Sequence, residues 1–367
     1  MIPISKPIIG EQEKKAVLEV LDSGMLVQGK KTLELESRFA EFCGVKHAVA
    51  LNSGTAAIHA ALYALGIKEG DEVITAPFTF VASANPILMM GAKVIFADVM
   101  PDTFNIDPAC LERVITERTK AVIPIDLFGL SADYSRIRRI ADEHNLLIIE
   151  DACQAHGAKF FGKMAGSLGH IGCFSFYATK NMMCGEGGMI TTDNPEYAEM
   201  CKRFRHHGQS EQTRYEYLDI GYNYRIMDLT AALALAQLDR LPGFLAARRR
   251  NAGLYNDGLA DIPGITLPSE PEGYEHVYNQ YTILCDNKKI MRDKLASDLR
   301  ELGVGTAIYY PKPLHLHHHF AKLGYKQGDF PVSEMFASRV LSLPVGPHVS
   351  ESDIKSIIST IKKLGEV

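Results

Sequence analysis

The sequence predicts an α/β protein with a large, mostly parallel sheet of seven strands, followed by a smaller α+β domain. Short apolar runs alternate with helical patterns over most of the first two thirds of the chain. These runs are unbroken stretches rich in Val, Ile and Leu, which is typical of strands buried on both faces of a parallel sheet. A chain of 367 residues is long for one core. We therefore expect a large domain over 1–240, including an N-terminal arm, and a small domain over 241–367.

The first two thirds of the chain contain the seven candidate strands. They are expected at 47–51, 72–75, 93–97, 121–125, 146–150, 172–177 and 187–192. Helical patterns fall between several of them, at 55–66, 108–116 and 133–144. In open sheets of this kind, ligands bind at the carboxyl ends of the strands. Asn52, Asp151 and Lys180 fall at or near such ends.

The pattern changes after about residue 193. A helix near 195–206 leads into a polar, tyrosine-rich loop at 207–227, and a second helix follows at 228–240. Pro242-Gly243 interrupts the helical pattern, and a helix to about residue 260 should lead into the small domain. That domain is expected to contain a strand at 280–285, a helix at 289–302, a strand near 304–309 and a closing helix at 351–364.

Composition and charge are ordinary for a soluble globular protein and exclude several kinds of partner. Hydrophobic residues make up 46% of the chain, charged residues 23%, and the net charge is −5, so we expect no nucleic-acid partner. No apolar run reaches the roughly 18 residues of a membrane span, and the N-terminus lacks the layout of a signal peptide. We therefore expect no membrane partner. The seven cysteines are scattered without a CxxC pair, which favours reduced thiols in a cytoplasmic protein.

A short histidine-rich run at 314–319 (LHLHHH) raises the question of a metal site. A chelating pair together with distant carboxylates would be required, and this order of residues matches no defined ligand spacing. We therefore expect no metal site in the protein.

Lys180 and Asp151 are the residues that indicate the chemistry. Lys180 follows an apolar strand and precedes the glycine-rich segment 185–188, while Asp151 ends another apolar strand. Pyridoxal phosphate (PLP) requires an amine for a Schiff base and a carboxylate that keeps its pyridine nitrogen protonated, so that the ring withdraws electrons. Each residue alone has an ordinary interpretation, as a surface lysine and as an aspartate that caps a turn. Brought to one edge of a sheet, the pair predicts a PLP site.

A second feature suits the phosphate of such a cofactor. The segment 52–57 (NSGTAA) lies between a strand and an alanine-rich helix. Backbone N–H groups at a helix start are unpaired, and the helix dipole favours an anion there. Gly54 permits close approach, and Ser53 or Thr55 can add a hydroxyl donor. Taken alone, this segment is also compatible with an ordinary N-cap.

These elements occur together in one order, and the set resembles a known family. The motifs are NSGTAA at 52–57, IIEDACQAHGA at 148–158, FSFYATKN at 174–181, GEGG at 185–188 and GYNYR at 221–225. They resemble the DegT-type sugar aminotransferases, which are PLP enzymes of the aspartate aminotransferase-like fold type I. The resemblance runs nearly end to end, so the large domain would be the PLP-binding one.

The resemblance implies PLP as the cofactor, with pyridoxamine phosphate as its aminated form during turnover. Lys180 would bind PLP covalently and move a proton between the substrate carbon and the cofactor, and Asp151 would pair with the pyridine nitrogen. The other implied contacts are Gly54, Thr55 and Ser175 at the phosphate, Gln154 at the ring hydroxyl, Phe80 stacked on the ring, and Asn223 at the phosphate of the other subunit.

The resemblance also implies a homodimer with shared active sites. The loop 207–227 and the segment 309–315 would help to bind the substrate. The substrate contacts expected from them are Arg225, Tyr309, Tyr310 and His315. Arg225 suits a phosphate or carboxylate because its cation is planar, although a structural ion pair would explain it equally well. Relatives that handle acidic sugars carry His where this chain has Tyr309, which weakens a uronic-acid assignment.

The expected reaction is transfer of an amino group, by analogy from L-glutamate, to a nucleotide-linked keto sugar. The GEGG segment at 185–188 favours 4-keto over 3-keto sugars, because members that act at C3 tend to show GDGG. A cyclitol or amino-shikimate-type transaminase remains an alternative, as does a PLP-binding regulatory protein without turnover. A PLP-dependent sugar dehydratase would carry His at position 180. A nicotinamide oxidoreductase is disfavoured because the glycine-rich run 166–172 is not GxGxxG and precedes a strand.

Overall fold

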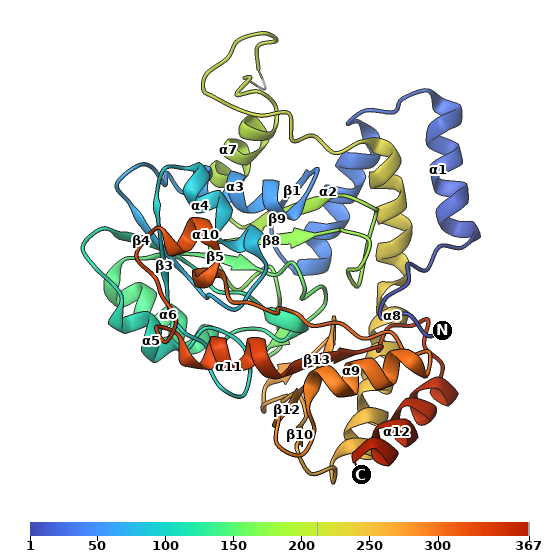
Figure 1. Cartoon of the computed structure of the whole chain (residues 1–367). Coiled ribbons are helices and arrows are strands. Elements are labelled where there is room, and N and C mark those ends of the chain that lie inside the picture. The colour runs from blue at the N-terminus through green and yellow to red at the C-terminus, as the bar shows by residue number, and fades with distance from the viewer. Residues whose placement is uncertain (211, 366–367) are drawn as a thin grey trace.

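The computed structural model describes residues 1–210 and 212–365, and its centre is a seven-stranded sheet (Figure 1). The sheet order is β1-β9-β8-β5-β4-β2-β3, and in this sheet β9 is antiparallel to both neighbours while the remaining pairs are parallel. The predicted sheet is thus confirmed. Its strands are β1 (His47–Leu51), β2 (Glu72–Thr75), β3 (Lys93–Phe96), β4 (Thr119–Ile123), β5 (Leu147–Asp151), β8 (Ile171–Ser175) and β9 (Gly188–Thr192).

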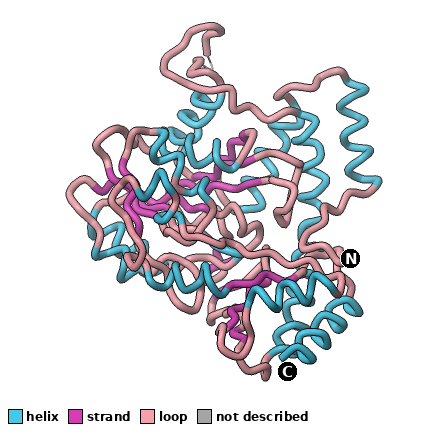
Figure 2. Tube along the Cα trace, viewed as in Figure 1, coloured by secondary structure: helices cyan, strands magenta, loops and turns pink. Residues whose placement is uncertain are grey.

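Helices cover both faces of this sheet, which Figure 2 shows as magenta strands enclosed by cyan helices. Val49 and Ile149 face a cluster that includes α3 (Gly54–Ala64) and α7 (Pro195–Arg205). Ala50 on the opposite face packs with α2 (Lys30–Cys43). The strands read as unbroken apolar runs because both sets of side chains are buried. The other helices around the sheet are α4 (Asn85–Met89), α5 (Pro108–Arg113), α6 (Tyr134–His144), α10 (His318–Ala321) and α11 (Pro331–Arg339), while α1 (Glu11–Ser23) packs on α8 (Asp228–Leu259).

The break predicted at Pro242-Gly243 is wrong, because one continuous helix, α8 (Asp228–Leu259), runs through it. Its first half packs on α1 and α2, and its second half packs on α12 (Glu351–Gly365). Tertiary packing on both sides of the proline offsets the hydrogen bond that proline removes. Residue 240 therefore lies inside α8, and the division of the chain there stays a proposal. Residues 366–367 of the predicted small domain lie outside the described residues, as does residue 211 in the loop 207–227.

The C-terminal part has its own apolar core around a three-stranded sheet of β10 (Ile265–Thr266), β12 (Tyr281–Cys285) and β13 (Val340–Leu343). The helices α9 (Arg292–Glu301) and α12 contribute to the same core. The strand predicted near 304–309 is wrong. That segment makes only isolated bridges, from Val304 to Ile2 and from Ala307 to Ser342, and the strand that pairs with β12 is β13. Short strands at β6 (Lys159–Phe160), β7 (Lys163–Met164) and β11 (Tyr274–Glu275) form a third sheet.

No helix within the described residues combines the length and apolar character needed to cross a lipid bilayer.

Candidate active site

A cavity of about 790 Å³ opens at the carboxyl ends of the sheet strands, and the segment 308–311 from the C-terminal part closes one side of it. This volume lies within the range of small-molecule sites, about 300–1,000 Å³. Nine of the residues expected from the sequence line it: Gly54, Thr55, Phe80, Asp151, Gln154, Ser175, Lys180, Tyr309 and Tyr310. Asn223, Arg225 and His315 lie elsewhere in the described chain.

Lys180 reaches the cavity from the loop that follows β8. Its backbone N–H donates to the Tyr177 carbonyl at 2.9 Å, and the next residue, Asn181, is buried and donates to the Val277 carbonyl. Burial lowers the pKa of the Lys180 ammonium, and the nearby Cys153 and Asp151 oppose this effect. A lowered pKa leaves more of the amine neutral, which is the form that attacks a carbonyl carbon or accepts a proton.

Asp151 ends β5 with its carboxylate almost fully buried in the wall of the cavity. Ser83 Oγ donates to Oδ2 at 2.7 Å, and the Cys153 backbone N–H donates to Oδ1 at 3.2 Å. Each carboxylate oxygen can accept a further hydrogen bond. The side chain is therefore fixed in orientation and able to bind one more donor, such as the protonated nitrogen of an aromatic ring.

Gln154 joins two walls of the cavity. Its Oε1 accepts from the Phe128 backbone N–H at 2.9 Å, and its Nε2 donates to the Tyr310 hydroxyl at 3.2 Å. Burial raises the pKa of Tyr310, so the phenol is neutral at physiological pH. Tyr310 also lies 6.2 Å from Phe80, measured between ring centroids. These contacts connect the sheet side of the cavity to the segment from the C-terminal part.

The first turn of α3 forms a cradle that suits a phosphate. Ser53 caps the helix by accepting from the Ala56 N–H, and the N–H groups of Gly54 and Thr55 have no partner within the helix. A Cβ on Gly54 would come within 2.8 Å of the Ser175 Cβ, and a Cβ on Gly188 would come within 2.2 Å of the Ser53 carbonyl oxygen. Both glycines therefore permit the close packing that brings the helix start, Thr55 and Ser175 to one wall.

Asn223 and Arg225 lie on the loop between α7 and α8, which projects from the body of the molecule in Figure 1. Asn223 is exposed, and its carbonyl accepts from the Asn52 side chain at 3.4 Å. Arg225 Nη1 contacts His206 Nδ1 at 2.7 Å and lines a separate surface hollow. Within one chain, neither side chain lines the cavity.

His315 lies outside the cavity within one chain. Its side chain is fully buried, its Nε2 lies 3.1 Å from Glu334 Oε1, and its ring packs edge-on against Phe330. Its contact with the substrate stays a prediction. Over the described ranges, the group of residues that could hold a metal ion is an exposed one, formed by Glu112, Glu143 and His144.

Two buried hydroxyls in the cavity wall were not expected from the sequence. Thr79 and Ser83 are both buried and both line the cavity. In the segment around Phe80, only the aromatic ring was expected to contact PLP, although Thr79 and Ser83 lie in the same stretch of sequence. Only the fold reveals that Ser83 contacts Asp151, because the two residues are 68 positions apart.

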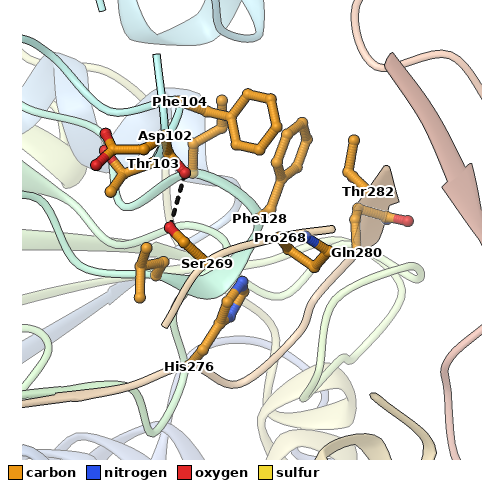
Figure 3. Close-up of a pocket in the computed structure, with 11 residues that line it drawn as sticks. Asp102, Thr103, Phe104, Phe128, Pro268, Ser269, His276, Gln280 and Thr282 are labelled. Carbon is orange, nitrogen blue, oxygen red and sulfur yellow. Dashed lines mark hydrogen bonds between the residues drawn. The ribbon is translucent and has the colours of Figure 1, made fainter. Parts of the chain in front are cut away.

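A much smaller cavity, drawn in Figure 3, lies behind the active-site wall. Phe128 and Gln280 line both cavities, and Ser269 Oγ donates to the Asp102 carbonyl at 2.7 Å beside the small one. Its volume of about 10 Å³ corresponds to about one water molecule. It is therefore a packing void and not a second ligand site.

Comparison with known proteins decides the family. The model of the DegT/DnrJ/EryC1/StrS aminotransferase family matches residues 7–362. The chain belongs to this family. It is 39% identical to GDP-perosamine synthase from Caulobacter vibrioides, over 99% of this chain and 98% of that protein.

Solved structures of family members agree with the fold. DesV from S. venezuelae superposes with a TM-score of 0.93 at 36% identity and covers 97% of this chain and 94% of its own. The sugar aminotransferase Spr1654 from Streptococcus pneumoniae, described as putative, has a PLP-form structure with a TM-score of 0.95 at 31% identity, covering 100% and 98% of the two chains. As a family member, the chain is a PLP-dependent sugar aminotransferase with the fold type I architecture.

The residues present fit this cofactor. The cavity offers an amine at Lys180 for an aldehyde, a buried carboxylate at Asp151 for a ring nitrogen, and a glycine-lined helix start for a phosphate. The amine, carboxylate and phosphate cradle match the three chemically distinct parts of PLP.

Proposed function

We propose that this aminotransferase moves an amino group from L-glutamate to the keto group of a nucleotide-linked sugar, with a 4-keto sugar favoured over a 3-keto sugar. The observation that carries the proposal is the cavity in which Lys180, Asp151 and the start of α3 come together. The 39% identical GDP-perosamine synthase supports a nucleotide-linked sugar as the substrate. The GEGG segment at 185–188 supports the 4-keto class.

When bound, PLP supplies an aldehyde and an electron-withdrawing ring. In our proposal Lys180 Nζ would bind the aldehyde carbon and be released when the amino donor takes its place. The freed Nζ would take a proton from the carbon of the amino donor and pass it to the cofactor. In the second half-reaction it would move a proton from the cofactor to the sugar carbon that receives the amine. Its lowered pKa supports both roles, since a neutral amine accepts a proton and the resulting ammonium donates it.

The remaining residues bind and orient in this proposal. Asp151 accepts the hydrogen bond of the protonated ring nitrogen, so that the ring keeps its positive charge. The start of α3 binds the phosphate with backbone N–H groups, together with the Thr55 and Ser175 hydroxyls. Phe80 stacks on the ring, and Gln154 contacts the ring hydroxyl through the amide that already joins Tyr310.

We also propose that two copies of the chain share their active sites. Large apolar side chains are exposed on two segments of the surface, with Val27 at 69% and Ile220 at 78% of full exposure. A second copy that covers them would bury this apolar area. Asn223 lies on the same loop as Ile220 and could reach the phosphate site of the partner, with Arg225 available for an anionic group of the substrate. The two segments are 25–33 and 215–227, and their other exposed apolar side chains are Met25, Leu26, Leu33, Tyr215, Tyr217, Leu218, Tyr222 and Met227.

The substrate is proposed to lie between the sheet edge and the segment 308–311, where Tyr309 and Tyr310 face the cavity. Two phenol rings offer apolar faces to a sugar and hydroxyls to its polar groups. The seven free cysteines support a cytoplasmic location, where nucleotide-linked sugars are available. A cyclitol ketone remains the second candidate substrate, because it would present a similar ring of hydroxyls.

The test is a panel of UDP-, dTDP- and GDP-linked 4-keto and 3-keto sugars, each supplied with L-glutamate and purified enzyme. We expect 2-oxoglutarate and an amino sugar to form with one or more of the 4-keto sugars. Lys180→Ala provides the background rate. Turnover of an inosose or another cyclitol ketone, with none of the nucleotide-linked sugars accepted, would overturn the substrate assignment.

A further inference from the structure

Two hydroxyl groups and the Asp151 carboxylate are joined by successive hydrogen bonds inside the wall of the active site. Thr79 Oγ1 lies 3.0 Å from Ser83 Oγ, and Ser83 Oγ lies 2.7 Å from Asp151 Oδ2. All three side chains are buried, with exposures of 2% for Thr79, 2% for Ser83 and 4% for Asp151. Each of them also lines the 790 Å³ cavity.

The chemistry fixes the direction of these hydrogen bonds. An ionised carboxylate can only accept, so the single proton of the Ser83 hydroxyl is directed at Asp151. Ser83 can then only accept from Thr79, and the Thr79 hydroxyl must be the donor. Hydrogen bonds arranged in this way polarise one another and are stronger than isolated ones. Thr79 therefore donates to Ser83, and Ser83 donates to Oδ2 of Asp151.

Backbone hydrogen bonds fix the positions of Ser83 and Asp151. Ser83 belongs to a turn of 3-10 helix at Val81–Ser83, and its N–H donates to the Phe80 carbonyl at 3.1 Å. On the other carboxylate oxygen, the Cys153 N–H provides the second anchor at 3.2 Å. The two donors fix the plane of the Asp151 carboxylate, and each oxygen keeps the capacity to accept from a ligand.

We infer that Ser83 and Thr79 are positioning residues, which hold the Asp151 carboxylate oriented toward the ring nitrogen of PLP. This inference rests on the proposed role of Asp151 and adds two side chains to the site. Neither hydroxyl touches the reacting atoms, so both act through the carboxylate. Their removal should therefore change the same properties as removal of the Asp151 charge, to a smaller extent.

The experiment measures the dissociation constant of PLP, the visible absorbance of the PLP-loaded enzyme between pH 6 and 10, and kcat and KM for L-glutamate. Ser83→Ala should weaken PLP binding about tenfold, since it removes a hydrogen bond to a charged group. Thr79→Val keeps the side-chain shape and should weaken binding about twofold. Both variants should lower kcat with KM unchanged, and Thr79→Ser should restore the wild-type values.

A matched control separates this role from a structural one. Thr282 and Ser342 form another buried hydroxyl pair, 2.9 Å apart, between β12 and β13. Thr282→Val should lower the thermal midpoint without altering PLP affinity or the absorbance profile. If Thr79→Val and Ser83→Ala lower only the thermal midpoint, as this control does, the inference is overturned.

Combination with Asp151→Asn distinguishes failure of the inference from failure of the proposed function. The effect of Ser83→Ala on PLP affinity should largely disappear in the Asp151→Asn background, because the hydroxyl acts through the carboxylate charge. Additive effects would overturn the positioning role and leave the role of Asp151 intact. An Asp151→Asn variant that behaves like the wild type would overturn both.

Discussion

The cavity wall at the sheet edge and the loop 207–227 are built in opposite ways. In the wall, Asp151 and Gln154 are buried and each has hydrogen-bond partners within the same chain. On the loop, Asn223 is exposed and Ile220 is 78% exposed, although the sequence pattern implicates both regions in one site. The cavity wall is thus organised within one chain, whereas in our proposal the loop provides groups for the active site of a second copy.

The largest expected effect is that of replacing Lys180, which supplies the amine of the cavity wall. Lys180→Ala should lower kcat by about a thousandfold or more, because covalent capture and proton transfer both disappear. Absorbance after addition of PLP and then L-glutamate measures both losses. Lys180→Arg is the matched control, since it keeps a positive charge and should be equally inactive. A variant that retains more than a tenth of the wild-type rate would contradict the assignment.

Asp151→Asn should have the next largest effect. The amide replaces a buried charge that accepts from the ring nitrogen, so kcat should fall about a hundredfold, as for loss of other preorganised electrostatic groups. PLP should still bind, because Lys180 and the start of α3 remain, although its affinity should fall further than in Ser83→Ala. Steady-state kinetics and a PLP titration give the two values. Loss of PLP binding with an unchanged rate per bound PLP would point to a purely structural role.

Gly54→Ala tests the phosphate side of the wall. The new Cβ would come within 2.8 Å of the Ser175 Cβ, so the helix start must shift away from the strand. We expect PLP affinity to fall about tenfold, with a smaller change in the kcat of the fully loaded enzyme. Gly243→Ala on α8 is the control, since nothing lies within 4 Å of its added Cβ. Equal PLP affinity in both variants would argue against a phosphate at this helix start.

Asn223→Ala tests whether the loop 207–227 contributes to PLP binding, as the cavity wall does. If the loop of one copy completes the site of the other, PLP affinity should fall about threefold, the effect of one lost hydrogen bond. Mixed dimers of Asn223→Ala with Lys180→Ala should then contain one site that carries both defects and one that carries neither. Recovery of activity in the mixture, with the two parent variants assayed separately, supports shared sites. An absence of recovery at every mixing ratio would count against them.

The smallest effect concerns pH. Because burial lowers the pKa of Lys180, its neutral form is reached at a lower pH than in an exposed lysine. The rate of PLP capture by the apoprotein should therefore rise with pH and level off below the value of about 10.4 for a free lysine. Stopped-flow absorbance between pH 7 and 10.5 measures this rate. A rate that still rises steeply at pH 10.5 would indicate an ordinary exposed amine.

The sequence predicted the parts of the molecule whose signals are local. Seven apolar runs mark the seven strands, and Lys180, Asp151 and the 52–57 segment follow directly from strand ends. The continuity of α8 through Pro242 was not predictable, because it depends on packing against α1, α2 and α12. The strand β13 was missed for a similar reason, since its pairing with β12 joins residues about sixty positions apart.

The same distinction between local sequence signals and tertiary contacts applies to the active site. Side chains at strand ends were predicted, whereas the contact from Ser83 to Asp151 depends on two segments that meet only in the fold. The position of His315 likewise depends on the fold, because within one chain this residue is a buried partner of Glu334. Local motifs therefore predicted the candidate reacting groups, and tertiary structure was needed for the groups that contact them.

The most direct test of the account is to load the enzyme with PLP, reduce the complex with borohydride and map the modified peptide by mass spectrometry. The account predicts one pyridoxyl phosphate group per chain, attached to Lys180. Addition of L-glutamate before the reduction should release this lysine and abolish the label. Stable labelling of any other lysine, or no labelling of Lys180 at saturating PLP, would contradict the proposal that this amine and Asp151 hold the cofactor between them.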